Sequence, residues 1–168
     1  SMVYQRKVKS LNKNELDVIW AVTSEQRELD LLPIMIPIFK GLIGYRIMVI
    51  QGSKQDTLTH LFSTQQIKTM VAIQGTDWAD TGILRANGFK VHTSDWYNGF
   101  YRGVSKGFYD YLPKSILEPW AEMRRFQFKN LVVEKKHLLY YPSAMYFFVQ
   151  KDNKALAQRL EYGLNQAI

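Results

Sequence analysis

Short apolar runs, rich in β-branched residues and bounded by glycine or polar residues, alternate along this chain with segments of helical spacing. Runs of this length and composition predict buried strands, because β-branched side chains pack well on a pleated surface. The predicted strands span residues 15–22, 44–52, 70–76, 89–94, 107–115, 131–142 and 144–150. Strands that alternate with helices predict an α/β fold with largely parallel sheets.

Helices are predicted between these strands and at both ends of the chain. Helical spacing predicts a polar surface helix within 3–14, one or two helices within 56–70, and helices near 95–106 and 116–125. The segment DWADTGILRANG (77–88) predicts a helix capped by Asp77, with Asp80 completing a variant of the capping box. The C-terminal tail predicts a helix capped by Asn153, whose apolar face carries Leu156, Leu160, Leu164 and Ile168.

A nine-residue apolar ribbon from Leu31 to Phe39 follows the polar cluster of Thr23, Ser24 and Arg27. The ribbon is too short to cross a bilayer as a helix. Its two prolines, at 33 and 37, also oppose a helix, so extended structure is predicted.

The length of 168 residues suits one domain or two small lobes. Because 46% of the residues are hydrophobic, the chain can bury a core and is predicted to fold. The formal net charge of +7 suits nucleic acid or anionic membranes, but the basic residues are scattered, which favours a solvated surface. The chain has no cysteine, so disulfides and thiolate sites are excluded. Residues 1–16 show no secretory signal pattern.

Motifs for catalysis are absent from the sequence. The three histidines stand apart without metal-ligand spacing, and no nucleophile elbow, dinucleotide-binding glycine motif or P-loop occurs. The sequence therefore predicts no metal, no cofactor and no catalytic residue.

Two turns after predicted strands are candidates for ligand binding. Gly75, Thr76 and Asp77 follow one strand, where backbone N–H groups at the start of a helix can bind a polar ligand group. Thr23, Ser24 and Arg27 follow another, where a guanidinium can hold a carboxylate through two parallel hydrogen bonds. A satisfied strand–turn–helix and a surface arginine are the alternatives.

Four stretches of the chain resemble the type II periplasmic solute-binding proteins, specifically the family that serves ABC transporters for polar amino acids. The stretches are NELDVIWAVTSEQRELDLLPIMIPIFKGLIGYRIMVI, VAIQGTDWADTGILRANGFKV, GFYDYLPKSILEPW and YYPSAMYFFVQKDNKALAQRLEYGLNQAI. The resemblance implies an α/β fold of two lobes, with lobe one at 1–44 and 141–168 and lobe two at 45–140. The family's opening strand–helix–strand unit has no counterpart, so lobe one is predicted to be incomplete.

The resemblance also implies a function: non-enzymatic binding of a small polar or carboxylate-bearing, amino-acid-like solute in a cleft between the lobes. Arg27 would bind the carboxylate, with Thr23 as a hydroxyl partner, and the Gly75 turn would bind from lobe two. The family's acid for the ligand ammonium falls at Lys114 and Ser115, and neither side chain is an acid.

Partners and location follow from the same resemblance. An ABC permease or a fused sensor protein is the predicted partner, and the predicted location is periplasmic or extracytoplasmic. An incomplete lobe exposes a sheet edge, so self-association into a homo-oligomer is predicted as well.

Two alternatives remain open at this point. The first is a dehydratase-like enzyme on the same fold, for which Glu118 and Asp110 are the candidate acid and base. The second is a basic nucleic-acid-binding module, disfavoured because most aromatic residues lie in strand-like core runs. Its candidate residues are Arg124, Arg125, Lys129, Lys135 and Lys136.

Overall fold

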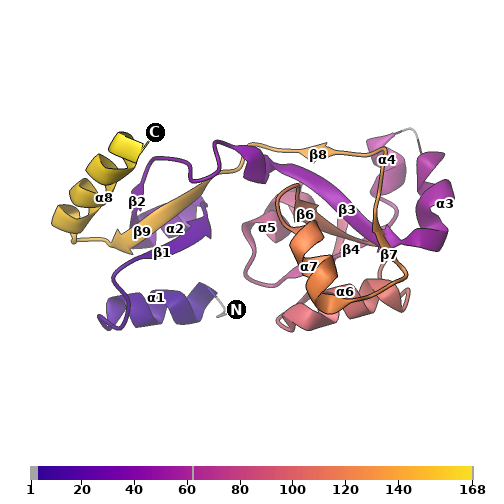
Figure 1. The fold of residues 1–168 in the computed structure, drawn as a ribbon, viewed down its shortest axis with the longest axis horizontal. Helices are drawn as coiled ribbons and strands as arrows, with labels where there is room; N and C mark the ends of the chain where they lie inside the picture. Colours follow the sequence, from indigo (N-terminus) through magenta and orange to yellow (C-terminus); the bar gives the residue numbers. More distant parts are fainter. Residues whose placement is uncertain (1–3, 62, 168) are drawn as a thin grey trace. The chain divides into compact units, whose positions relative to one another are not determined.

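The computed structural model describes residues 4–61 and 63–167. The chain folds into two compact units, Ser1–Ile43 with Pro142–Ile168 and Gly44–Tyr141. The chain therefore passes between the units twice, once on either side of the second unit. Figure 1 labels the helices and strands of each unit.

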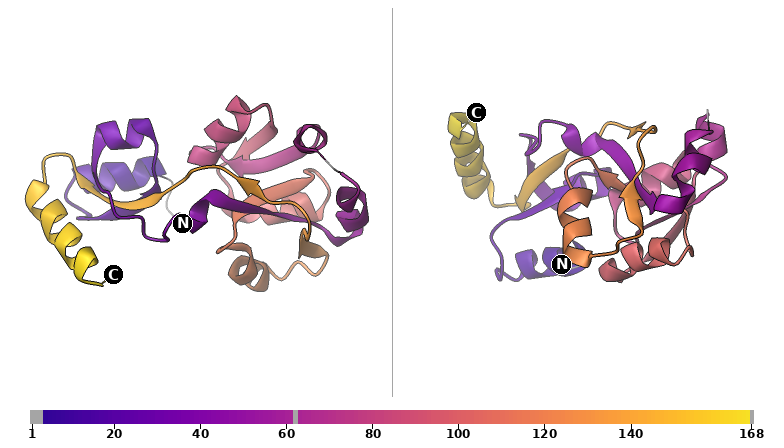
Figure 2. Two further views of the ribbon diagram at one scale, coloured as in Figure 1. Left: turned by 90° about the horizontal axis from the view of Figure 1, so that it is seen from above. Right: turned by 45° about the vertical axis from the view of Figure 1, so that its right-hand side comes forward.

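The first unit is built on a three-stranded antiparallel sheet with the order β1-β9-β2. Its strands are β1 (Ile19–Val22), β2 (Leu31–Ile34) and β9 (Met145–Gln150). Its helices are α1 (Tyr4–Asn12), α2 (Glu25–Asp30) and α8 (Lys154–Ala167); α1 packs at the β1 side and α8 at the β2 side (Figures 1 and 2). The core consists of Leu11, Ile19, Leu31 and Phe148.

Extended structure is confirmed for the start of the proline ribbon, where β2 pairs with β9 in the register Pro33↔Phe148. Proline is tolerated here because β2 is an edge strand, where a missing N–H removes little. Asn153 caps α8 as predicted, since its Oδ1 accepts a hydrogen bond from the Leu156 N–H at 3.2 Å. Ile168, the last residue of the predicted apolar face, lies outside the described residues.

The second unit contains a larger sheet with the strand order β5-β4-β6-β3-β7, and β8 also pairs with β3. The prediction of largely parallel sheets is wrong: β4 runs parallel to β5 and β6, whereas β3 is antiparallel to β6, β7 and β8. The strands are β3 (Tyr45–Gln51), β4 (Val71–Gly75), β5 (Lys90–Ser94), β6 (Tyr111–Ser115), β7 (Leu131–Val133) and β8 (Leu139–Tyr140).

Helices cover both faces of this sheet. Along β3, Val49 points into one apolar cluster, whereas Met48 and Ile50 point into another, as the two-residue repeat of a strand requires. The Val49 cluster includes residues of α6, and the other includes Leu58 of α3 and Ile67 of α4. The helical segments are η1 (Leu42–Gly44), η2 (Gly52–Lys54), α3 (Gln55–Thr59), α4 (Thr64–Ile67), α5 (Ala79–Ala86), α6 (Tyr97–Ser105) and α7 (Pro119–Phe126).

Two segments predicted as strands, 44–52 and 131–142, pair with each other within the second unit. Residues 49–51 pair with 131–133, and Tyr45 and Arg46 pair with Tyr140 and Leu139. None of the helices in the described part of the chain combines the length and apolarity that a membrane span requires.

Candidate functional site

The polar turn after β1 is held by hydrogen bonds within the turn and helix α2. Ser24 is the N-cap of α2, and its Oγ accepts a hydrogen bond from the Arg27 N–H at 3.4 Å. The Thr23 hydroxyl donates to the Glu28 carboxylate. Both hydroxyls thus fix the local backbone that presents Arg27.

Arg27 is buried, with 8% of its surface exposed. Its guanidinium donates to the Val22 carbonyl oxygen and lies over the Tyr4 ring, with Cζ 4.1 Å from the ring centroid. Contacts from β1 and α1 therefore orient the planar group. Such orientation lowers the entropy lost when a guanidinium binds a carboxylate.

The Gly75–Thr76–Asp77 turn joins β4 to α5 and differs from the prediction in two respects. The Thr76 N–H, expected to be unpaired, donates to the Ser94 carbonyl oxygen at 3.3 Å. The N-cap position of α5 belongs to Trp78, which makes no side-chain capping bond, so the predicted capping by Asp77 is wrong. Asp80 accepts from Tyr141 and does not complete a capping box. The physical reasons are that the β4–β5 pairing extends to the Thr76 N–H and that α5 begins at Ala79, two residues after Asp77.

Gly75→Ala is expected to lower the free energy of unfolding of the second unit by about 1–3 kcal/mol. A Cβ at this position would meet the Trp78 indole at 2.5 Å, so the ring must shift. The matched control is Gly82→Ala in α5, where a Cβ meets nothing within 4 Å and helix propensity favours alanine. Urea titration of both variants checks this; equal losses would contradict it.

Lys114 and Ser115 end strand β6, and both are buried. The Lys114 Nζ lies 3.0 Å from Glu118 Oε1 and 3.2 Å from Glu122 Oε1. It also stands over the rings of Trp78 and Tyr97, at 4.8 and 5.3 Å from their centroids. Burial alone would lower the pKa of Lys114, but Glu118, Tyr97 and Glu122 prevail and raise it. The lysine therefore stays charged at neutral pH.

The hydroxyls of two tyrosines on α6 complete the surroundings of Glu122. Tyr97 and Tyr101 each donate to one oxygen of this carboxylate. Burial and then the bond to Glu122 raise the pKa of Tyr101, and burial raises that of Tyr97 to about 12. Both hydroxyls therefore remain protonated donors at neutral pH.

A second buried ion pair lies at the start of β3. The Arg46 Nη2 is 2.7 Å from Asp80 Oδ1, with side-chain exposures of 5% and 8%. The Tyr141 hydroxyl donates to the same Asp80 oxygen, and the Arg46 guanidinium stands 5.5 Å from the Tyr141 ring centroid. Arg46 also reaches Glu118, at 3.8 Å, which joins the two ion pairs.

We call Arg46, Asp80, Lys114, Glu118 and Glu122 the strand-end cluster. Arg46 pairs with Ser115 across β3 and β6, and β4 runs parallel to β6, so the cluster lies where β4 and β6 end. Two cations face three carboxylates, which leaves one negative charge. Glu118 has the most exposed of the five side chains, at 35%. The cluster can therefore present a carboxylate to a polar ligand.

The candidate acid and base of the enzyme alternative, Glu118 and Asp110, do not come together in the structure. Asp110 precedes β6 and Glu118 follows it, so they lie at opposite ends of one strand. Asp110 pairs with Lys54 at 2.7 Å and accepts the Val71 N–H; these bonds lower its pKa although burial opposes them. Within 4–61 and 63–167, no three His, Asp or Glu side chains gather closely enough to hold a metal.

Three members of the cluster were not among the site residues predicted from the sequence: Arg46, Asp80 and Glu122. One signal was available: Lys114 ends a buried strand, and acids follow it at four-residue steps. A charged side chain in an apolar strand needs a partner of opposite charge, and Glu118 and Glu122 are the nearest acids in sequence.

Comparisons with known proteins give structural matches only. No protein-family model and no curated protein matches the chain. Among solved structures, the truncated arginine-bound arginine-binding protein of T. maritima matches 100% of this chain and 76% of its own, at 16% identity and a TM-score of 0.74. The periplasmic VFT2 domain of Bordetella pertussis BvgS matches 98% and 68%, at 14% identity and a TM-score of 0.76.

A third match comes from work on glutathione import through GshT and the cystine ABC importer TcyBC of Streptococcus mutans. It covers 99% of this chain and 70% of its own, at 14% identity and a TM-score of 0.72. At such identities the matches establish the fold and no more. The chain has the periplasmic-binding-protein-like α/β fold that its sequence predicts.

Proposed function

We propose that this chain binds a small polar, carboxylate-bearing solute of amino-acid-like chemistry, without transforming it. The observation that carries the proposal is the strand-end cluster, a group of buried charges where β4 and β6 end. In open α/β sheets, ligands bind beyond the carboxyl ends of strands. A chain with a binding-protein-like fold and charged groups at that edge is suited to hold a polar solute.

The proposal assigns the ligand carboxylate to Arg27, whose guanidinium is oriented by Val22 and Tyr4. It assigns an ammonium group of the ligand to Glu118. The Glu118 carboxylate accepts the Ser115 N–H at 2.8 Å, so it lies beside the position at which the resemblance implies an acid. Two features support this role. The Glu118 side chain is 35% exposed, and the cluster carries one more negative charge than positive charges.

Known proteins of this fold favour binding over catalysis. The matched structures include an arginine-binding protein, a histidine kinase sensor domain and a protein of glutathione import. We extend the proposal to the partner and location: an ABC permease or a fused sensor protein, outside the cytoplasm. Co-purification with a membrane permease, or fusion to a kinase in the full gene product, would test this part.

A thermal-shift screen followed by titration calorimetry tests the ligand assignment. Amino acids are compared with the same carboxylates lacking the amine. A ligand at about one hundred times its dissociation constant is expected to stabilise the folded chain by about 2.7 kcal/mol. Glu118→Gln is expected to remove most of the preference for the amine while leaving binding of the plain carboxylate. Stabilisation by no carboxylate in the screen would overturn the proposed function.

A further inference from the structure

The outer side of α6 and α7 in the second unit carries basic and aromatic side chains that the solute site does not use. Trp96 precedes α6 and is 58% exposed, and Trp120 in α7 is 52% exposed. The Trp96 ring rests on Gly99, where a Cβ would meet it at 2.5 Å, so the first turn of α6 holds the ring outward. Sequence analysis placed most aromatic residues in the core; these two lie outside it.

The basic residues of this region are also exposed. Arg102 of α6 lies four residues before Lys106, the C-cap of that helix, and on α7, Trp120 and Arg124 have the same separation. Residues four apart lie on one side of a helix. We call the exposed residues of this region the α6–α7 surface, whose cations are Arg102, Lys106, Arg124, Arg125 and Lys129.

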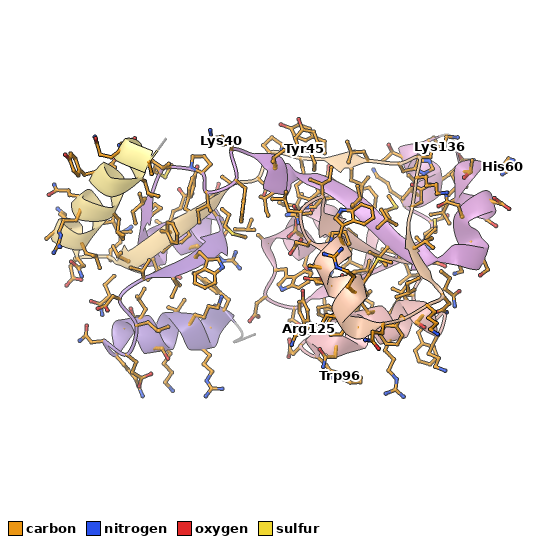
Figure 3. The ribbon with its side chains drawn as sticks, viewed as in Figure 1. Lys40, Tyr45, His60, Trp96, Arg125 and Lys136 are labelled. Atoms are coloured by element: carbon orange, nitrogen blue, oxygen red, sulfur yellow. The ribbon has the colours of Figure 1, made fainter. Side chains whose placement is uncertain are left out.

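Contacts between the helices hold α6 and α7, which carry these residues, side by side. The Phe126 ring of α7 lies 5.0 Å from the Tyr101 ring and 6.2 Å from the Tyr97 ring of α6. The Ser105 hydroxyl bonds Asn130 Oδ1 at 2.7 Å, which places Lys129 beside the C-terminal end of α6. Figure 3 labels Trp96 and Arg125, the neighbours of Tyr97 and Phe126, on this side of the unit.

The charge of the surface is strongly unbalanced. Within residues 97–133, all of which the structure describes, every exposed charged side chain is basic. The three acids of that stretch are only partly exposed and pair with lysines: Asp110 with Lys54, and Glu118 and Glu122 with Lys114. Asp95, next to Trp96, is the nearest exposed acid in sequence. The result is a net positive field beside the two exposed indole rings.

We propose that the α6–α7 surface docks on anionic phospholipid bilayers. Indole rings favour the headgroup region, where their apolar body and N–H are both accommodated. Exposed Arg and Lys side chains are attracted to anionic headgroups within a Debye length. A single nucleic-acid strand also binds cations and aromatic rings, but in a groove that follows its backbone. Here the side chains project from the outside of two helices, which suits a bilayer plane.

Vesicle flotation of the full chain tests the proposal. Binding is expected to vesicles of phosphatidylcholine mixed equally with phosphatidylglycerol, and not to phosphatidylcholine alone. It should fall steeply as salt rises from about 0.1 M to about 1 M. The double variant Arg124→Glu, Arg125→Glu should lose at least about tenfold in partitioning, from the reversal of two charges at the membrane surface. Trp96→Ala with Trp120→Ala should also weaken binding.

Matched controls lie on the first unit. Lys9→Glu with Lys13→Glu changes the net charge equally at two exposed lysines, and Trp20→Ala removes an indole that is 56% exposed. Both should bind vesicles like the unchanged chain, and circular dichroism verifies the folding of all variants. Equal binding to both vesicle types, equal loss in the controls, or tighter binding to a single-stranded oligonucleotide at the same salt would overturn the proposal.

Discussion

Lys114→Met is expected to lower the free energy of unfolding of the second unit by about 3–5 kcal/mol, the cost of leaving a buried ionic group without its partner. The Lys114 side chain is 2% exposed and lies within 3.2 Å of both Glu118 and Glu122. Methionine fills a similar volume but removes the Lys114 cation from Glu122 and leaves Glu118 with Arg46, at 3.8 Å. The effect is fully present at neutral pH, because the folded-state pKa of Lys114 is raised and its contribution is lost only in alkali.

The matched control is Lys54→Met, which removes a more exposed lysine–carboxylate pair of the second unit. Lys54 and Asp110 are 2.7 Å apart, but their side chains are 31% and 32% exposed. Such a partly solvated pair contributes at most about 1 kcal/mol. Urea titration followed by circular dichroism and tryptophan fluorescence measures both variants. If both variants lose the same free energy of unfolding, the prediction that the buried ion pairs of Lys114 contribute more than an exposed pair is wrong.

A rescue variant keeps this prediction testable if Lys114→Met fails to fold. Adding Glu118→Gln and Glu122→Gln removes both carboxylate charges that faced Lys114, so the triple variant should recover much of the lost stability. A triple variant less stable than Lys114→Met would show that the carboxylates are not the source of the loss.

Most elements were predictable from the sequence because each depends on local chemistry. The apolar run at 44–52 forms β3, and Asn153 caps α8 through its own side chain. The direction of β3 was not predictable in this way. Strand–helix alternation suggests parallel neighbours, but β3 pairs with β6, β7 and β8, which enter from later parts of the chain. Those pairings depend on tertiary packing, which periodicity does not report.

The strand-end cluster was even less predictable from the sequence than the direction of β3. Asp80 and Tyr141 are 61 residues apart, and Tyr97 and Glu122 are 25 apart, yet each pair shares a hydrogen bond. Asp80 fits the sequence pattern of a helix-start acid, and its ion pair with Arg46 appears only when β3 lies beside β6. The turn residues Thr23, Ser24 and Arg27 were identified from sequence because they are local to one strand end. The role of Arg27 toward a ligand stays a prediction.

Arg27→Ala is expected to weaken carboxylate binding by roughly 2–5 kcal/mol, the range for truncating one partner of a buried charge pair. This corresponds to a loss of about thirtyfold to several thousandfold in affinity. Because Arg27 also bonds Val22 and stacks on Tyr4, the variant should lose some stability in the first unit. Arg27→Lys should recover only part of the affinity, since an ammonium cannot form two parallel hydrogen bonds.

Two controls separate ligand binding from stability in this experiment. Tyr4→Ala removes the ring beneath the guanidinium but keeps Arg27 itself, so it should cost stability and only part of the affinity. Arg6→Ala removes an exposed arginine of α1 and should change neither. Titration calorimetry, run well below each variant's melting temperature, measures affinity on folded protein alone. If the unchanged chain and Arg27→Ala bind a carboxylate ligand with equal affinity, Arg27 does not belong to the binding site.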